Sequence, residues 1–185
     1  MEFPFYVLLS SAFGTFAIVW RESETGPMVN RIFLPDEQSS VENIIQTAFA
    51  NSSKLSCPAI SELGERIQSF LRGEAIDFGL DVIALERCSA FQKQVLLSVY
   101  DIPRGKVSTY GNIARDLGVP GGARAVGGAL SHNPFPIIIP CHRVIGSDGG
   151  PGGFQGGLIM KQAFFKLEGI EFSRTGKVLP NKIHF

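Results

Sequence analysis

A cysteine, a histidine and an arginine stand side by side in the segment IIIPCHRVI, residues 137–145. A deprotonated cysteine sulfur is a strong nucleophile, and histidine is a common base for removing its proton. Neighbouring side chains of an extended segment point to opposite sides, so we expect His142 to reach Cys141 only through a water molecule or a turn. A buried packing role for the sulfur is the alternative, and we favour chemistry.

The backbone before this cysteine is restricted by three prolines. The prolines are Pro134, Pro136 and Pro140, and they fix the main chain on both sides of the isoleucine run 137–139. This pattern predicts a buried, strand-like segment that holds Cys141 in place. The chemistry also requires the sulfur to be an anion when it reacts, because a free thiol has a pKa of about 8.5.

The other two cysteines, Cys57 and Cys88, have no Cys or His at ligand spacing. An odd number of cysteines without regular spacing excludes a disulfide framework and indicates a reducing compartment. Cys141 with its neighbouring His142 supplies half of a zinc site at most. We therefore expect no metal, and we interpret Cys57 and Cys88 as buried or half-buried bystanders.

Charge is distributed unequally along a chain whose net charge is zero. Residues 1–87 contain 6 Lys/Arg and 12 Asp/Glu, whereas residues 88–185 contain 11 and 5. A basic half is typical of proteins that bind a polyanion such as nucleic acid. The charge alone is a weak indication, since an excess of one sign is often only a solvated face.

Residues 3–20 carry no charge over eighteen positions, which is the length of a marginal membrane span. Two short apolar runs, 5–9 and 15–20, flank the turn-like sequence SSAFG, and this arrangement favours a β-hairpin. No basic region or cleavage site of a signal peptide accompanies the segment. We therefore expect no membrane association.

The rest of the acidic half predicts a small sheet with helices. Residues 28–35 read as a third strand, 51–58 as a loop and 75–89 as an extended connector, with helices over 39–49 and 59–74. The apolar spacing then predicts helices over 89–102, 108–118 and 123–133, and we place a domain boundary near residue 86.

The last two of these helices, joined by a glycine-containing turn, have the outline of a helix-turn-helix. The second of them, 123–133, has a nearly bare surface of alanine and glycine with one arginine, Arg124, in its first turn. Close packing against another helix explains the small residues, and so does close approach to a nucleic-acid backbone. In the second case Arg124 would act as a wedge in place of an extruded base.

PCHRVI, preceded by RAVGGALSHNPFPIIIP and followed by GGLIMKQAFFKLEG, closely resembles the O6-alkylguanine-DNA alkyltransferase family. The resemblance covers residues 88–171, including FQKQV and GKVSTYGNIA, and extends weakly to SSAFGTFAIVW near the N-terminus. It implies an α/β (α+β) fold in two domains. A ribonuclease-H-like domain with a small antiparallel sheet would span 1–86, and a mainly helical domain with a winged-helix type of helix-turn-helix would span 87–185.

The resemblance also implies an activity: irreversible, single-turnover transfer of a methyl or small alkyl group from O6 of guanine, and less well O4 of thymine, to Cys141. His142 would take the proton of the thiol through a water while Glu168 orients it. Tyr110 would donate to the base and Lys161 would support the site. Two rivals stay open: a lesion-binding relative that transfers nothing, and a sequence-specific regulator.

The resemblance further assigns residues to DNA and to the flipped base. Those expected at DNA are Arg124, Ala123, Ala125, Gly127, Ser108 and Thr109. Those expected around the base are Tyr110, Leu130, Asn133, Pro136, Val144, Gly153, Phe154 and Gln155; Asn133 would also tie the helix-turn-helix to the cysteine segment. Gln155 departs from the small polar residue common there, and the glycine-rich loop 146–157 lacks the G-K-[ST] of a phosphate-binding P-loop.

The implied partner is double-stranded DNA containing O6-alkylguanine, bound by a monomer. We expect no cofactor, and a cytoplasmic location, or a nuclear one in a eukaryote.

Overall fold

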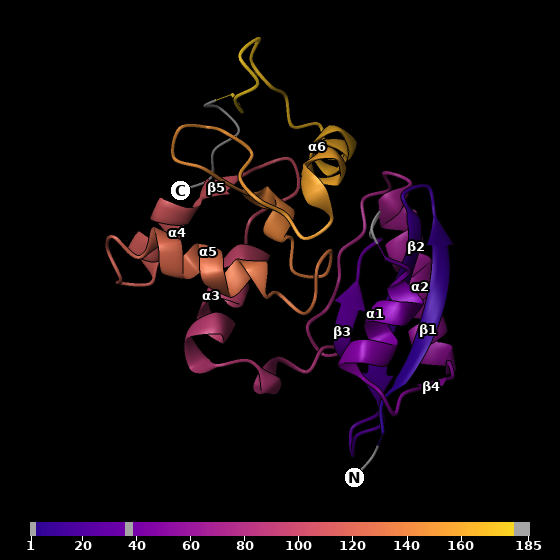
Figure 1. The fold of residues 1–185 in the computed structure, drawn as a ribbon. Helices are drawn as coiled ribbons and strands as arrows, with labels where there is room; N and C mark the ends of the chain where they lie inside the picture. Colours follow the sequence, from indigo (N-terminus) through magenta and orange to yellow (C-terminus); the bar gives the residue numbers. More distant parts are fainter. Residues whose placement is uncertain (1–2, 36–38, 180–185) are drawn as a thin grey trace. The chain divides into compact units, whose positions relative to one another are not determined.

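The computed structural model describes residues 3–35 and 39–179. The chain divides into two compact units, residues 1–85 and 86–185 (Figure 1). The first contains a four-stranded sheet and two helices, and the second is mainly helical.

The sheet of the first unit has the strand order β3-β2-β1-β4. Strands β1 (Phe5–Ser11) and β2 (Gly14–Arg21) form the predicted hairpin, and β3 (Met28–Phe33) continues it antiparallel. The expected loop 51–58 differs, because β4 (Ser53–Lys54) within it pairs parallel with β1. Strand β1 would otherwise be an edge with unpaired backbone groups, and the amides of Ser53 and Leu55 donate to carbonyls of this edge.

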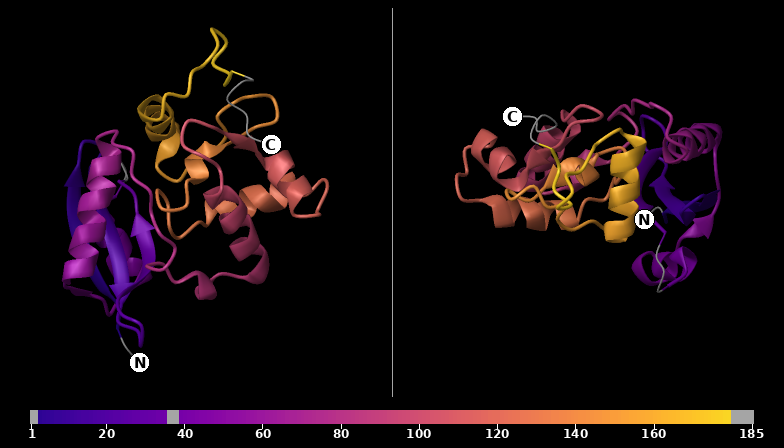
Figure 2. Two further views of the ribbon diagram at one scale, coloured as in Figure 1. Left: turned by 180° about the vertical axis from the view of Figure 1, so that it is seen from behind. Right: turned by 90° about the horizontal axis from the view of Figure 1, so that it is seen from above.

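Helices α1 (Val41–Ala48) and α2 (Pro58–Leu71) cover opposite faces of this sheet (Figure 2). Alternate residues of a strand face opposite sides. Tyr6, Ala17 and Val19 pack with α1, whereas Leu9 contacts α2 at Gly64, where a Cβ atom would lie 2.6 Å from Cδ1 of Leu9. Burial on both sides explains why the hairpin reads as apolar runs that resemble a membrane segment.

The second unit contains helices α3 (Ala90–Tyr100), α4 (Tyr110–Asp116), α5 (Ala123–Ser131) and α6 (Gly157–Leu167). Helix α5 contacts both α3 and α4, and the turn between α4 and α5 contains Gly118 and Gly121, which both have positive φ. This is the predicted helix-turn-helix. Helix α4 starts two residues later than predicted, because Ser108 and Thr109 form strand β5 and pair with β6 (Val144–Ile145).

Within the described residues, no helix is both long and apolar enough to cross a membrane.

Candidate active site

The segment that leads to Cys141 is buried, as predicted, but it is not a strand. Ile137, Ile138 and Ile139 are at most 2% exposed, yet they lie in a turn closed by a bridge between Pro136 and Ile139. The turn is built on a side chain: Asn133 accepts from the amide of Phe135 (2.9 Å) and donates through Nδ2 to the carbonyl of Ile139 (3.2 Å). A buried Asx turn of this kind satisfies main-chain groups that a strand would have paired with a neighbour.

Cys141 and His142 belong to a short 3-10 helix, η2 (Cys141–Arg143), so the expectation of an extended segment at the cysteine was wrong. From the sequence we expected either a water molecule or a turn to connect the two side chains, and the structure has a helical turn at this position. Cys141 is 6% exposed and lines a cavity, while His142 is completely buried. The ring of His142 lies edge-on to Phe164, at 5.2 Å between ring centroids, and this packing restricts its orientation.

Glu168, at the end of α6, joins His142 and Arg143 in one buried cluster. Its Oε1 lies 2.8 Å from Nε2 of His142, and the guanidinium of Arg143 donates to both carboxylate oxygens at 2.8–3.2 Å. Arg143 also donates to the carbonyl of Ile102 (2.6 Å). The structure therefore brings together His142 and Glu168, which are 26 positions apart, and adds Arg143 to them.

Sequence reasoning did not assign a role to Arg143. The only signal in the sequence was its position directly after the histidine, because a buried carboxylate needs a positive partner but the burial of Glu168 is not visible in the sequence. Two parallel hydrogen bonds to one carboxylate are the geometry that arginine favours. Arg143 thus fixes the carboxylate that in turn fixes His142.

The charges of this cluster follow from burial and its partners. Burial would raise the pKa of Glu168, but the hydrogen bonds and charges of His142 and Arg143 lower it from 4.5 to about 2. Burial also lowers the pKa of His142, which is opposed by Glu168 and reinforced by the positive charges of Arg143 and Lys161. At neutral pH the carboxylate is therefore charged and the imidazole is neutral and able to accept a proton.

Burial raises the pKa of the Cys141 thiol, while a hydrogen bond from Asn133 and the charge of Lys161 lower it in part. The resting sulfur is therefore a thiol, and the anion that the chemistry requires forms only when the proton is removed. Ionisation has to be coupled to removal of the proton by a base.

Lys161 is fully buried on α6 and joins two segments of the site. Its Nζ donates to the carbonyls of Val144 (2.6 Å) and Gly153 (3.1 Å). Burial lowers the pKa of Lys161 to about 8, opposed by the negative charge that Cys141 can carry. A solvated helix lysine, which the sequence alone would suggest, is thus excluded.

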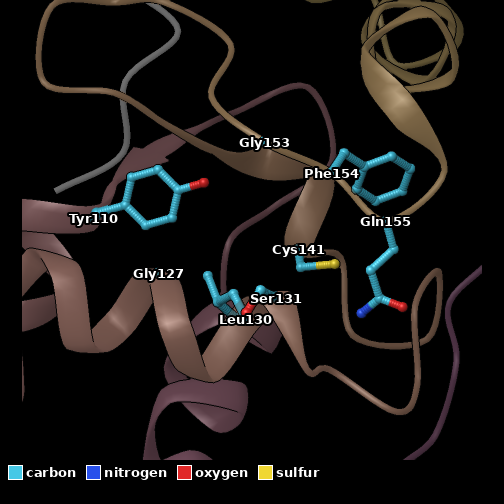
Figure 3. Close-up of a pocket in the computed structure, with 8 residues that line it drawn as sticks. All are labelled: Tyr110, Gly127, Leu130, Ser131, Cys141, Gly153, Phe154 and Gln155. Atoms are coloured by element: carbon cyan, nitrogen blue, oxygen red, sulfur yellow. The ribbon is translucent and has the colours of Figure 1, made fainter.

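A cavity of about 340 Å³ opens beside the Cys141 sulfur (Figure 3). This volume lies at the small end of the range for ligand pockets, about 300–1,000 Å³. Five of the residues expected around the base line it, together with Cys141, Gly127 and Ser131; the five are Tyr110, Leu130, Gly153, Phe154 and Gln155. Ser131 was not anticipated.

The other three residues expected around the base, Asn133, Pro136 and Val144, are buried and are not among the side chains that line the cavity. Asn133 holds the turn, as expected of a residue that ties the two segments, and Val144 receives a hydrogen bond from Lys161.

The residues expected at DNA divide into two groups. Arg124 and Ala125 are exposed on α5, and Ala123 and Gly127 are partly exposed. Ser108 and Thr109 are buried at 4% and 8% exposure, and the hydroxyl of Thr109 caps α4 by accepting from the amide of Asn112 (3.0 Å). The structure therefore gives this pair a structural role, and their contact with DNA stays a prediction.

Comparisons with known proteins identify the relatives of this chain. A sequence profile described as 6-O-methylguanine DNA methyltransferase, DNA binding domain, matches residues 90–170. A methylated-DNA–protein-cysteine methyltransferase of Methanothermobacter thermautotrophicus is 46% identical over 60% of this chain and 62% of that relative. One of Mycolicibacterium paratuberculosis is 39% identical over 76% of each chain.

Among solved structures, Mycobacterium tuberculosis OGT in complex with DNA superposes with a TM-score of 0.68 at 30% identity, covering 89% of this chain and 92% of that one. The α/β fold class is thereby confirmed. The chain belongs to the methylated-DNA–protein-cysteine methyltransferase family, as the resemblance predicted. The names of the relatives describe the expected class of activity, transfer of a methyl group from DNA to a protein cysteine.

Proposed function

We propose that this protein repairs double-stranded DNA by moving a methyl or small alkyl group from O6 of guanine, and less well from O4 of thymine, to its own Cys141. The observation that carries the proposal is the cavity, which has a buried cysteine on its wall, with a buried histidine–carboxylate pair that starts at the next residue of the same short helix. Each molecule reacts once, because the thioether formed is stable.

In the proposed step the Cys141 sulfur forms a bond to the alkyl carbon while the bond from that carbon to guanine O6 breaks. The electron pair of the broken bond stays on the guanine, which gains one proton in place of the alkyl group. The proton that the thiol gives up to a base balances this one, once the base has released it. Atoms and charge balance without an oxidant, reductant, metal or organic cofactor.

His142 takes the thiol proton in this proposal. Its Nε2 contacts Glu168, so Nδ1 is the nitrogen that accepts, through a bridging water. Transfer to a positioned base of this kind accelerates reactions by about 10²–10⁴-fold. The Glu168 carboxylate stabilises the imidazolium that forms, and Arg143 keeps that carboxylate in place.

Tyr110 and Lys161 serve the leaving base and the loop above it. Burial and the nearby Cys141 raise the pKa of Tyr110, so its hydroxyl stays protonated and can donate to the guanine as negative charge develops. Lys161 is a positioning residue that fixes Gly153 and Val144, and its charge favours ionisation of the sulfur.

The target guanine has to leave the base stack to reach this cavity, which costs a few kcal/mol. We propose that Arg124, exposed on α5, fills the space it leaves, entering from the minor groove, and that the basic second unit binds the phosphates. We further propose that the protein acts as a monomer in the cytoplasm, or in the nucleus of a eukaryote. A ribonuclease-H-like character of residues 1–86 also remains a proposal.

The test is the intact mass of the protein after incubation with duplex DNA that contains O6-methylguanine. We expect a gain of one methyl group per molecule for the wild type and none for Cys141→Ser or with unmodified DNA. Binding of the damaged duplex without any gain in mass would instead indicate a lesion-binding protein and would overturn the proposal.

A further inference from the structure

Gln155 lines one end of the cavity and is held there by a hydrogen bond. It belongs to the glycine-rich loop, and its Nε2 donates to the main-chain carbonyl of Asn133 at 2.7 Å. That carbonyl belongs to the segment that directly follows α5, the helix that supplies Leu130 and Ser131 to the cavity. The side chain of Gln155 therefore ties the glycine-rich loop to the segment after α5, at the edge of the cavity.

The loop that carries Gln155 depends on such side-chain contacts for its position. Gly149, Gly152 and Gly157 have positive φ, and a segment this rich in glycine loses much conformational entropy when it is ordered. Lys161 holds the loop through a hydrogen bond to the carbonyl of Gly153. The hydrogen bond from Gln155 to the carbonyl of Asn133 holds it two residues further along. An interaction that orders the loop also fixes the size of the space beneath it.

The cavity has two distinct ends (Figure 3). Tyr110 lies at one end, Phe154 and Gln155 lie at the other, and the Cys141 sulfur is directed toward the Gln155 side. In the proposed reaction the alkyl carbon must meet this sulfur while the purine lies toward Tyr110. Any substituent on that carbon then extends toward Phe154 and Gln155.

We propose that Gln155 sets the upper size of the alkyl group that this protein accepts, restricting it to methyl and other small groups. The inference rests on the proposed alkyl transfer and adds its substrate limit. The long side chain occupies the space that a larger group would need, and its hydrogen bond to Asn133 prevents it from swinging into solvent.

The experiment compares rates of transfer from duplex oligonucleotides that contain O6-methylguanine or O6-benzylguanine. Gln155→Ala removes the bulk and the bond, while Gln155→Glu keeps the size but cannot donate to the Asn133 carbonyl. We expect Gln155→Ala to raise the benzyl-to-methyl ratio of rate constants about tenfold or more, since small steric differences in a pocket are worth about 10–200-fold. Gln155→Glu should raise it in the same direction.

The matched control is Gln162→Ala, the same change at an exposed position of α6, which should leave the ratio unchanged. A rise in Gln155→Ala alone would support the size limit and assign it to bulk. An unchanged ratio in both Gln155 variants, with methyl transfer intact, would overturn this inference and leave the proposed function standing. Failure of the wild type to transfer methyl would overturn both.

Discussion

Replacing Glu168 with glutamine tests the charged cluster behind the cysteine. The carboxylate of Glu168 is completely buried and is shared by His142 and Arg143, whose side chain is only 12% exposed. Glu168→Gln keeps the size and shape of the side chain but removes its charge. Arg143 then loses its counter-charge while it remains largely out of water.

The expected loss of stability can be worked out in two ways. The difference between the ordinary pKa of 4.5 and the value of about 2 in the folded protein corresponds to about 3 kcal/mol. Removing one partner of a buried ion pair costs about 3–5 kcal/mol. We therefore expect Glu168→Gln to lower the free energy of unfolding by about 3 kcal/mol at pH 7, which lowers a urea midpoint by about 1–2 M.

Glu168 should also make the free energy of unfolding depend on pH. Because the pKa of Glu168 is lower in the folded than in the unfolded protein, its stabilisation is complete above about pH 4.5 and is lost as the pH falls toward 2. Urea unfolding of the wild type from pH 7 down to pH 3 should show this loss. In Glu168→Gln the part of the slope that belongs to this carboxyl should be absent.

Glu171→Gln is the matched control, since it changes an exposed carboxylate three residues further along the chain. It should leave both the midpoint at pH 7 and the acid slope as in the wild type. The reasoning would be refuted if Glu168→Gln lost no more stability than Glu171→Gln, or if its acid slope equalled that of the wild type.

Three further predictions follow from named contacts. His142→Gln should slow methyl transfer by about 10²–10⁴-fold in single-turnover assays while binding to damaged DNA persists, and a rate near that of the wild type would remove His142 as the base. Asn133→Ala leaves the amide of Phe135 and the carbonyl of Ile139 buried without this partner, so chemical denaturation should show a loss of about 2–4 kcal/mol, and a loss near zero would contradict the role of the turn. Arg124→Ala should weaken binding to a lesion duplex about tenfold in a gel shift, unlike Arg174→Ala at an exposed position near the C-terminus, and equal effects of the two changes would contradict a specific role for Arg124.

Much of the fold was predictable because its elements have clear local signals. The helix predicted over 59–74 has Ile60, Leu63 and Ile67 on its buried face, and Gly73 with positive φ follows it. The hairpin within 3–20 was predictable from its central turn, although its burial on both faces imitates a membrane segment. The two-residue strand β4 was missed, because pairing with the edge of β1 is a tertiary contact with no local signal.

The segment before Cys141 shows where sequence patterns fail. Three consecutive isoleucines favour a strand by propensity, yet Asn133 folds them into a turn in which Ile137 has a φ of +78°. Side-chain hydrogen bonds to the backbone compete with regular structure, and their partners cannot be read from spacing. The buried character of the segment was predictable, whereas its conformation was not.

The resemblance to the alkyltransferase family identified site residues that local sequence patterns do not indicate. Glu168 and Lys161 look like surface residues of a helix, and their burial follows only from how α6 packs against η2. Arg143 was overlooked because its partner lies 25 positions away. Ser131 became visible only with the shape of the cavity.

The central claim concerns the destination of the alkyl group, and peptide mass mapping tests it most directly. The protein has three cysteines, of which Cys57 and Cys88 are partly exposed and Cys141 is buried at the cavity. After reaction with duplex DNA that contains O6-methylguanine, the account predicts a methyl group on the peptide with Cys141 and none on the other two. A methyl group on Cys57 or Cys88, or on no cysteine while the DNA is repaired, would contradict it.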